Sequence, residues 1–149
     1  MQFREYQMIS EKNLLCLTTE FEQQPLIDSL RRLRDESAKR GRQQQGKAIL
    51  IFPLSLKANE VTVCIPLDRS IHEPPDHFQF TARLYCDKAV RTRHEGQISK
   101  LKAVITQLIR YIEKQNLTPI SDVYCKVMDG MGQEPDMENT IADVYIGVK

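Results

Sequence analysis

Apolar residues recur every three or four positions in the second half of the chain, between about Gln97 and Gln115. This spacing puts them on one side of an α-helix, and the polar residues of the segment fall mostly on the other side. The apolar positions are Ile98, Leu101, Ile105, Leu108, Ile109 and Ile112. The pattern therefore predicts an amphipathic helix that buries this stripe.

A shorter stripe in the first half predicts a second helix. Leu26, Leu30 and Leu33 share one helical face, with Ile27 beside them. Pro25 suits the first turn, where its missing N–H costs nothing, and Gly41 suits the C-terminal end.

Extended runs surround each predicted helix in the same order, one before it and two after it. The first set is "NLLCLTTEF", "KAILIFPLS" and "NEVTVCIPL"; the second is "HFQFTARLYCDKAVRTRH", "ISDVYCKVMD" and "NTIADVYIGVK". A shift of about 75 residues lays Leu26 on Leu101 and Leu30 on Ile105. We interpret this as a duplicated β-α-β-β unit and expect an α+β fold with antiparallel sheets and one main helix per repeat. Coincidence between two amphipathic helices is the alternative.

With 149 residues the chain is long enough for one domain with a real core. We expect a single domain over residues 1–149, with the first repeat at about 1–70 and the second at about 76–149. The stretch "DRSIHEPPDH" forms the link, since Pro74 and Pro75 disfavour helix and sheet pairing. A second loop, Asp129–Asn139, is longer than a hairpin needs, and is either an acidic exposed tip or a functional loop.

Composition narrows the possible partners. A net charge of +1 argues against bulk nucleic acid or an anionic membrane as a partner, although Ser29–Arg42 is locally basic. The N-terminus lacks a signal peptide and no run is apolar enough to span a bilayer, so we expect a cytoplasmic protein.

The four cysteines are predicted to be reduced, inert core residues. They are Cys16, Cys64, Cys86 and Cys125. None forms a CxxC pair, and the three histidines are not spaced for a zinc site. We therefore expect no metal and no cofactor.

Alternation along two strand-like runs gathers polar residues on one surface. In "PISDVYCKVMD", Val123, Cys125 and Val127 point one way, whereas Asp122 and Tyr124 point the other way with Lys126. In "IADVYIGVK", Asp143 and Tyr145 likewise oppose an apolar face. If the two strands pair, two carboxylates and two phenols share one side of the sheet. That side is either a solvated sheet face or the wall of a pocket for a flat, apolar, cationic molecule.

The segment Thr92–Val127 resembles the second half of the gyrase-inhibitor-like (GyrI-like) effector-binding family. The matching features are the turn His94-Glu95-Gly96, the following "LxxxIxxLxxYI" helix pattern, an acid two residues before a tyrosine (Asp122 and Tyr124), and the closing strand "ADVYIGV". The resemblance covers the second half well and the first half only through the duplicated layout. It implies a two-repeat fold with a cleft between the repeats that takes lipophilic cationic drugs, often in the sensor domain of a transcription regulator.

The resemblance also implies where a ligand binds. The family's cleft acid is usually a glutamate, and the matching residue here is the shorter Asp122; aromatic walls must come from Tyr and Phe, because the chain has no tryptophan. We expect Asp122, Tyr124, Tyr145 and Asp143 to bind the ligand. No DNA-binding segment precedes the first strand, so we expect a stand-alone or excised module without direct nucleic-acid binding.

Two other functions stay open. Some stand-alone family members are hydrolases, and here Asp122 would act as the acid or base, with Tyr124 positioning water or substrate. A protein partner such as a topoisomerase would instead meet the basic helix surface. Its residues are Arg31, Arg32, Arg34, Lys39, Arg40 and Arg42.

Overall fold

Six antiparallel strands close into one ring in the order β1-β3-β2-β5-β6-β4. The computed structural model describes residues 1–149. Its elements are β1 (Arg4–Glu20), α1 (Gln23–Lys39), β2 (Ile49–Phe52), β3 (Glu60–Pro66), β4 (Phe78–Gly96), the single 3-10 turn η1 (Ile98–Lys100), α2 (Leu101–Lys114), β5 (Pro119–Asp129) and β6 (Thr140–Val148). The expected α+β fold with antiparallel strands is confirmed.

The two halves are connected in the same way. In the first half β3 pairs with both β1 and β2, and in the second half β6 pairs with both β4 and β5. The halves then join at two seams, β1 with β4 and β2 with β5. The element order of each half is therefore as expected, whereas the duplication itself stays a prediction.

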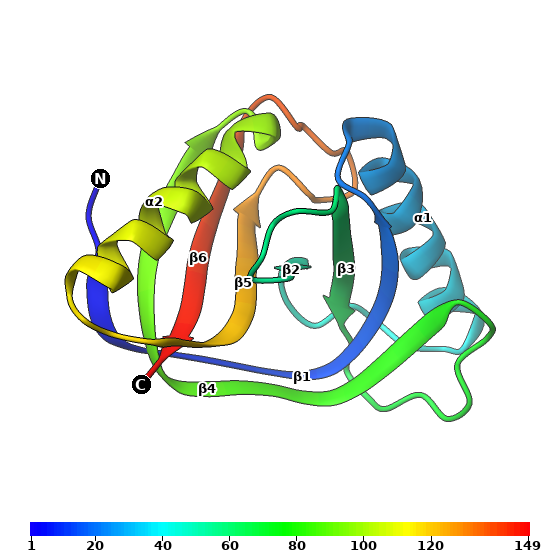
Figure 1. The fold of residues 1–149 in the computed structure, drawn as a ribbon. Coiled ribbons are helices and arrows are strands. Elements are labelled where there is room, and N and C mark those ends of the chain that lie inside the picture. Colours follow the sequence, from blue (N-terminus) through cyan, green and yellow to red (C-terminus); the bar gives the residue numbers. More distant parts are fainter.

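Both helices lie on the same side of the sheet, at opposite ends (Figure 1). α1 packs on β1 and β3, and α2 packs on β4 and β5. The predicted stripes are buried: Leu26, Leu30, Leu33, Leu101, Ile105, Leu108 and Ile112 are each at most 1% exposed. Ile27 and Ile109, at the borders of the stripes, are only partly buried. Neither helix is long and apolar enough to cross a membrane.

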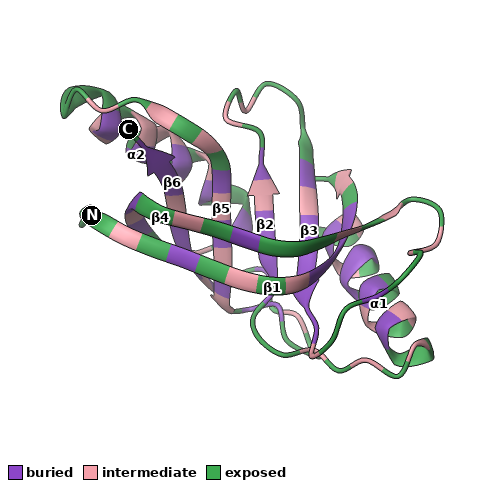
Figure 2. Ribbon diagram, turned by 90° about the horizontal axis from the view of Figure 1, so that it is seen from below, coloured by how far each residue is buried: buried purple, intermediate pink, exposed green.

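β1 and β4 are much longer than the other strands and run side by side along one end of the molecule (Figure 2). β1 begins at Arg4, well ahead of the expected start at Asn13. Its first part alternates largely between exposed and half-buried residues, and only Ile9 is fully buried. Pairing with β4, rather than apolar content, therefore extends the strand. Positive φ angles at Tyr6 and Asn13, with two register shifts, interrupt its regular alternation.

The loop between β5 and β6 is anchored to the core and is more than an acidic tip. Met131 and Met137 are buried in the main hydrophobic cluster. Gly130 has a φ of +105°, and a Cβ there would lie 2.6 Å from Thr140 Cγ2, so the turn requires glycine. Arg34 of α1 donates to the carbonyl oxygens of Met131 and Gly132, which ties the loop to the first helix.

Candidate functional site

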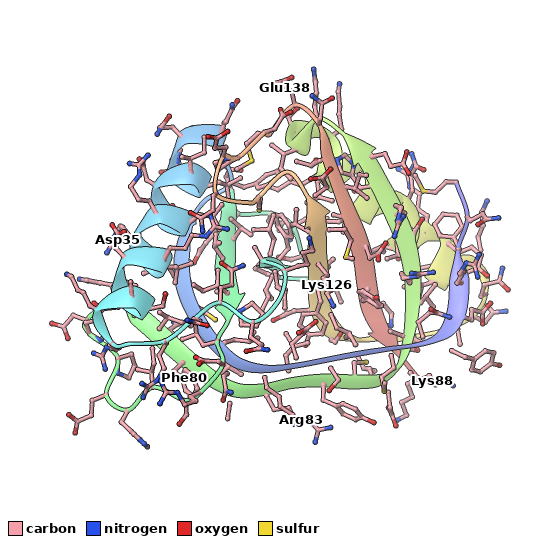
Figure 3. The ribbon with its side chains drawn as sticks, turned by 180° about the vertical axis from the view of Figure 1, so that it is seen from behind. Asp35, Phe80, Arg83, Lys88, Lys126 and Glu138 are labelled. Atoms are coloured by element: carbon pink, nitrogen blue, oxygen red, sulfur yellow. The ribbon has the colours of Figure 1, made fainter.

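The orientation of β5 agrees with the sequence pattern. Val123, Cys125 and Val127 are buried in the cluster beneath the helices. Asp122 and Tyr124 therefore lie on the other face of the sheet, together with Lys126. Lys126 is not free there, because its Nζ lies 2.8 Å from Glu11 Oε1 of β1 (Figure 3).

An open hollow of about 740 Å³ lies beside this face of β5. It is bounded by the first residues of β5, the middle of β4, and the chain just after β2. The lining residues are Leu54, Tyr85, Cys86, Asp87, Pro119, Ile120, Ser121, Asp122 and Tyr124. Because β2 belongs to the first half of the chain and β4 and β5 to the second, residues of both halves form its walls.

Two aspartates and two tyrosines are among the lining residues of this hollow. Asp87, Asp122 and Tyr85 are exposed, and Tyr124 is half-buried. Burial raises the pKa of Tyr124, and the Asp122 carboxylate adds to the rise, so the phenol stays protonated and can donate a hydrogen bond. Ile120 is 59% exposed and Tyr85 49% exposed, which leaves apolar surface open to a ligand.

Tyr85 already has a cation over its ring. The Arg83 guanidinium carbon lies 4.3 Å from the ring centroid, within the usual range of a cation–π contact. Arg83 is exposed on β4 (Figure 3) and does not line the hollow. One face of the ring is thus already occupied by the Arg83 cation, and a ligand cation would need its other face.

Of the four residues expected to bind a ligand, Asp122 and Tyr124 line the hollow. Tyr145 is the register partner of Tyr124 on β6 and packs against the smaller hydrophobic cluster, but it does not line the hollow. Asp143 is 5% exposed and does not line the hollow. Its carboxylate binds the Arg93 side chain at 2.8 Å and lies 3.7 Å from Arg91. Ligand binding by these residues stays a prediction.

The sequence pattern missed the β4 side of the hollow. Tyr85 and Asp87 alternate along "LYCDK" as Asp122 and Tyr124 do along "SDVY", so an acid and an aromatic ring share one face there too. That alternation was the available signal. Leu54 and Ile120 carried none, since isolated apolar residues at strand ends are common.

The two nucleophilic side chains in the hollow, Ser121 and Cys86, form no hydrogen bond with a basic side chain. Ser121 Oγ donates to the Asp122 carbonyl oxygen and accepts from Gly147 N–H, both at 2.7 Å, so its hydroxyl is occupied. The only hydrogen bond of the Cys86 thiol is to the Lys88 carbonyl oxygen, at 3.5 Å. No histidine lines the hollow. The arrangement suits binding better than nucleophilic catalysis.

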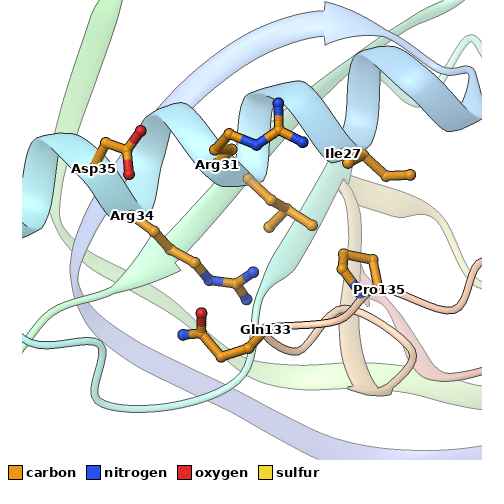
Figure 4. A pocket seen from close by; sticks show the side chains of 7 residues that line it. Ile27, Arg31, Arg34, Asp35, Gln133 and Pro135 are labelled. Carbon is orange, nitrogen blue, oxygen red and sulfur yellow. The ribbon is translucent and has the colours of Figure 1, made fainter.

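A smaller cavity of about 140 Å³ lies between α1 and the β5–β6 loop (Figure 4). Two arginines line it, Arg31 and Arg34, and Arg34 donates hydrogen bonds to two loop carbonyl groups and to Gln44 Oε1. Burial also lowers the pKa of Arg34. This cavity therefore marks where α1 is fastened to the second half of the chain.

The other arginines of the basic helix surface are also largely engaged. Arg40 donates to the carbonyl oxygens of His72 and Glu73, and Arg42 donates to that of Ser70. Arg31 pairs with Asp28, and Arg32 lies over the Phe78 ring. Arg40 and Arg42 of the predicted basic surface thus hold the link between the halves.

No protein-family model and no curated protein sequence matches the chain. Several solved structures share its fold, including two of EcmrR and one of a hydrolase. The crystal structure of the EcmrR C-terminal domain matches with a TM-score of 0.76 and 15% identity, over 99% of this chain and 97% of that one. EcmrR bound to DNA matches with a TM-score of 0.76 and 16% identity, and this chain spans 57% of its length. A hydrolase from Listeria innocua matches with a TM-score of 0.56 and 10% identity, over 99% of this chain and 90% of that one.

At these identities the matches show the fold alone. The chain therefore has an α+β fold consistent with its resemblance to the GyrI-like domains and shared with the C-terminal domain of EcmrR.

Proposed function

We propose that the chain is a small-molecule-binding module that takes lipophilic, cationic, drug-like compounds in the hollow between β4 and β5. One observation carries the proposal: two aspartates and two tyrosines line the same open hollow, together with apolar residues. A volume of about 740 Å³ lies within the range of small-molecule sites.

The lining supplies each interaction that such a ligand needs. Leu54, Ile120 and the tyrosine rings cover its apolar surface, at roughly 25 cal/mol per Å² removed from water. The ring faces attract its positive charge by about 0.5–2 kcal/mol. Asp87 and Asp122 supply the compensating negative charge. We expect micromolar affinity, roughly −8 kcal/mol.

A role in transcriptional regulation follows as part of the same proposal. The C-terminal domain of EcmrR has this fold, and EcmrR is a protein solved in complex with DNA. We infer that the present domain senses a compound and passes the signal to a DNA-binding partner, which is either fused to it or separate.

Hydrolysis of a bound compound is the second candidate. The fold shared with a hydrolase from Listeria innocua favours it, as does a carboxylate next to a tyrosine in the hollow. Hydrolysis is less well supported than binding, because no nucleophilic side chain in the hollow is hydrogen-bonded to a base. Product formation during prolonged incubation with a bound ester would move it to first place. Inhibition of a protein partner such as a topoisomerase ranks third, since the arginines that would serve it are engaged elsewhere.

The test compares a fluorescent lipophilic cation with a neutral compound of the same shape. Asp122→Asn and Asp87→Asn should each weaken binding of the cation by about 1–3 kcal/mol, the range for a charge-assisted contact. The neutral compound should lose much less. Tyr124→Ala should weaken both compounds, because contact with the ring does not require their charge.

Asp76→Asn is the matched control. It removes the same charge from an exposed aspartate in the link between β3 and β4, outside the hollow. Binding of the cation should be unchanged in this variant. If Asp76→Asn and the two hollow variants weaken the cation equally, general electrostatics accounts for binding and the proposed site is wrong.

A further inference from the structure

Three arginines gather on β1 and β4, on the sheet face that carries Tyr124 and Tyr145. Arg4 of β1 and Arg91 of β4 are direct register partners, and Arg93 follows Arg91 by two positions on β4. In a strand, residues two apart share a face, so Arg91 and Arg93 point to the same side. Directly opposed like charges destabilise an antiparallel pair. A negative charge close to Arg4 and Arg91 would therefore stabilise this arrangement.

The protein supplies only part of that charge. Asp143 binds Arg93 through both carboxylate oxygens, at 2.8 and 3.3 Å, and lies 3.7 Å from Arg91. Arg4 is exposed and forms no ion pair or hydrogen bond through its side chain. Asp143 thus pairs with two of the three guanidinium groups, and Arg4 has no carboxylate partner.

The nearest other acids do not neutralise Arg4. Glu95 lies two positions beyond Arg93 on β4 but forms no ion pair with it, and the raised pKa of Arg93 is due chiefly to Asp143. Glu5 follows Arg4, and its carboxylate accepts a hydrogen bond from the Tyr111 hydroxyl at 2.8 Å. Neither Glu95 nor Glu5 forms an ion pair with Arg4, so the positive charge of the Arg4 side chain is not compensated.

The arginines surround a small polar cavity of about 170 Å³. Its lining contains no hydrophobic residue and consists of Gln2, Arg4, Arg91, Thr92 and Arg93. The Thr92 hydroxyl donates to the Gln2 carbonyl oxygen at 2.8 Å, which fixes the start of the chain beside β4 and so positions Arg4. Planar guanidinium groups offer paired N–H donors that match the oxygens of a phosphate.

We propose that this cavity binds a phosphate group. Arg4 and Arg91 are the principal donors, and Arg93 remains fixed by Asp143 and supplies positive charge from the side. The site is separate from the hollow between β4 and β5: Tyr145 lies between Arg91 and Tyr124 in one row of register partners, so the sites share a sheet face without sharing a residue.

Titration with inorganic phosphate tests the proposal, at constant ionic strength because salt screens exposed charges. Phosphate should bind saturably to the wild-type chain and raise its melting temperature. Arg4→Gln should weaken phosphate binding about tenfold, as expected for a lost charge-assisted contact. Arg110→Gln is the matched control, because it removes one exposed arginine from α2 outside the cavity. Its affinity for phosphate should equal that of the wild type.

Stability without phosphate gives a second readout. Arg4→Gln removes the repulsion between Arg4 and Arg91, so the melting temperature of this variant in phosphate-free buffer should be slightly above that of the wild type. Added phosphate should then raise its melting temperature less than it raises that of the wild type. Equal phosphate binding by Arg4→Gln and Arg110→Gln, or no saturable binding to the wild type, overturns the proposal.

A further experiment distinguishes a phosphate group of a lipid from that of a soluble compound. Vesicles of phosphatidylcholine and phosphatidic acid in equal parts present it as a lipid headgroup. Arg4-dependent binding to these vesicles assigns the site to lipid, whereas binding to inorganic phosphate alone assigns it to a soluble compound.

Discussion

Cys86 differs from the other three cysteines in its surroundings. Cys16, Cys64 and Cys125 are buried, whereas Cys86 is half-buried and lines the hollow beside Tyr124. Burial raises the pKa of the Cys125 thiol, and the hydrogen bond with Cys16 and burial raise that of Cys64. Because the thiolate is the reactive form, both groups are unreactive at neutral pH. The expectation of free thiols agrees with the structure, but that of four equivalent core residues does not fit Cys86.

We predict that one thiol per folded chain reacts quickly with a water-soluble disulfide reagent, and that Cys86→Ser removes this fast phase. A lipophilic cation bound in the hollow should slow the reaction, because it covers the sulfur. Thiol release followed by absorbance measures both effects. A fast phase that persists in Cys86→Ser would contradict the assignment, and a rate unaffected by saturating cation would place the ligand elsewhere.

At the scale of elements, the helices were the most predictable part of the fold. Their apolar stripes follow the helical period, and Gly41, with a φ of +64°, ends α1 as the sequence indicated. The start of β1 was less predictable, because its first part forms a strand by pairing with β4 and buries few apolar residues. The β5–β6 loop was ambiguous for a similar reason: its acids are visible in the sequence, whereas the burial of Met131 and Met137 depends on the whole core.

Leu108 tests the predicted face of α2. It is fully buried, so Leu108→Ala should lower the free energy of unfolding by roughly 2–5 kcal/mol, through lost burial and the cavity left behind. Its exposed neighbour provides the control, and Gln107→Ala should change stability by about 0.5 kcal/mol or less. Urea unfolding measures both variants. A loss below about 1 kcal/mol for Leu108→Ala would mean that the core adapts to the missing side chain or that α2 packs differently.

At the scale of the whole molecule, closure of the ring decides which side chains meet. Alternation correctly predicted the face of Asp122 and Tyr124, because it depends only on the local period of a strand. It could not show that Tyr85 and Asp87 of β4 lie across the hollow from them, since that requires the path of a distant strand. Alternation also could not show that Asp143 forms an ion pair with Arg93, because this contact depends on the register between β4 and β6.

The most direct test of the account maps a bound lipophilic cation onto the chain by ¹⁵N chemical-shift changes. We predict that the largest changes occur at Tyr85, Asp87, Asp122 and Tyr124, with small changes along α1, whose buried stripe faces the other side of the sheet. Changes concentrated between α1 and α2, with the β4 and β5 residues unaffected, would contradict the proposed site.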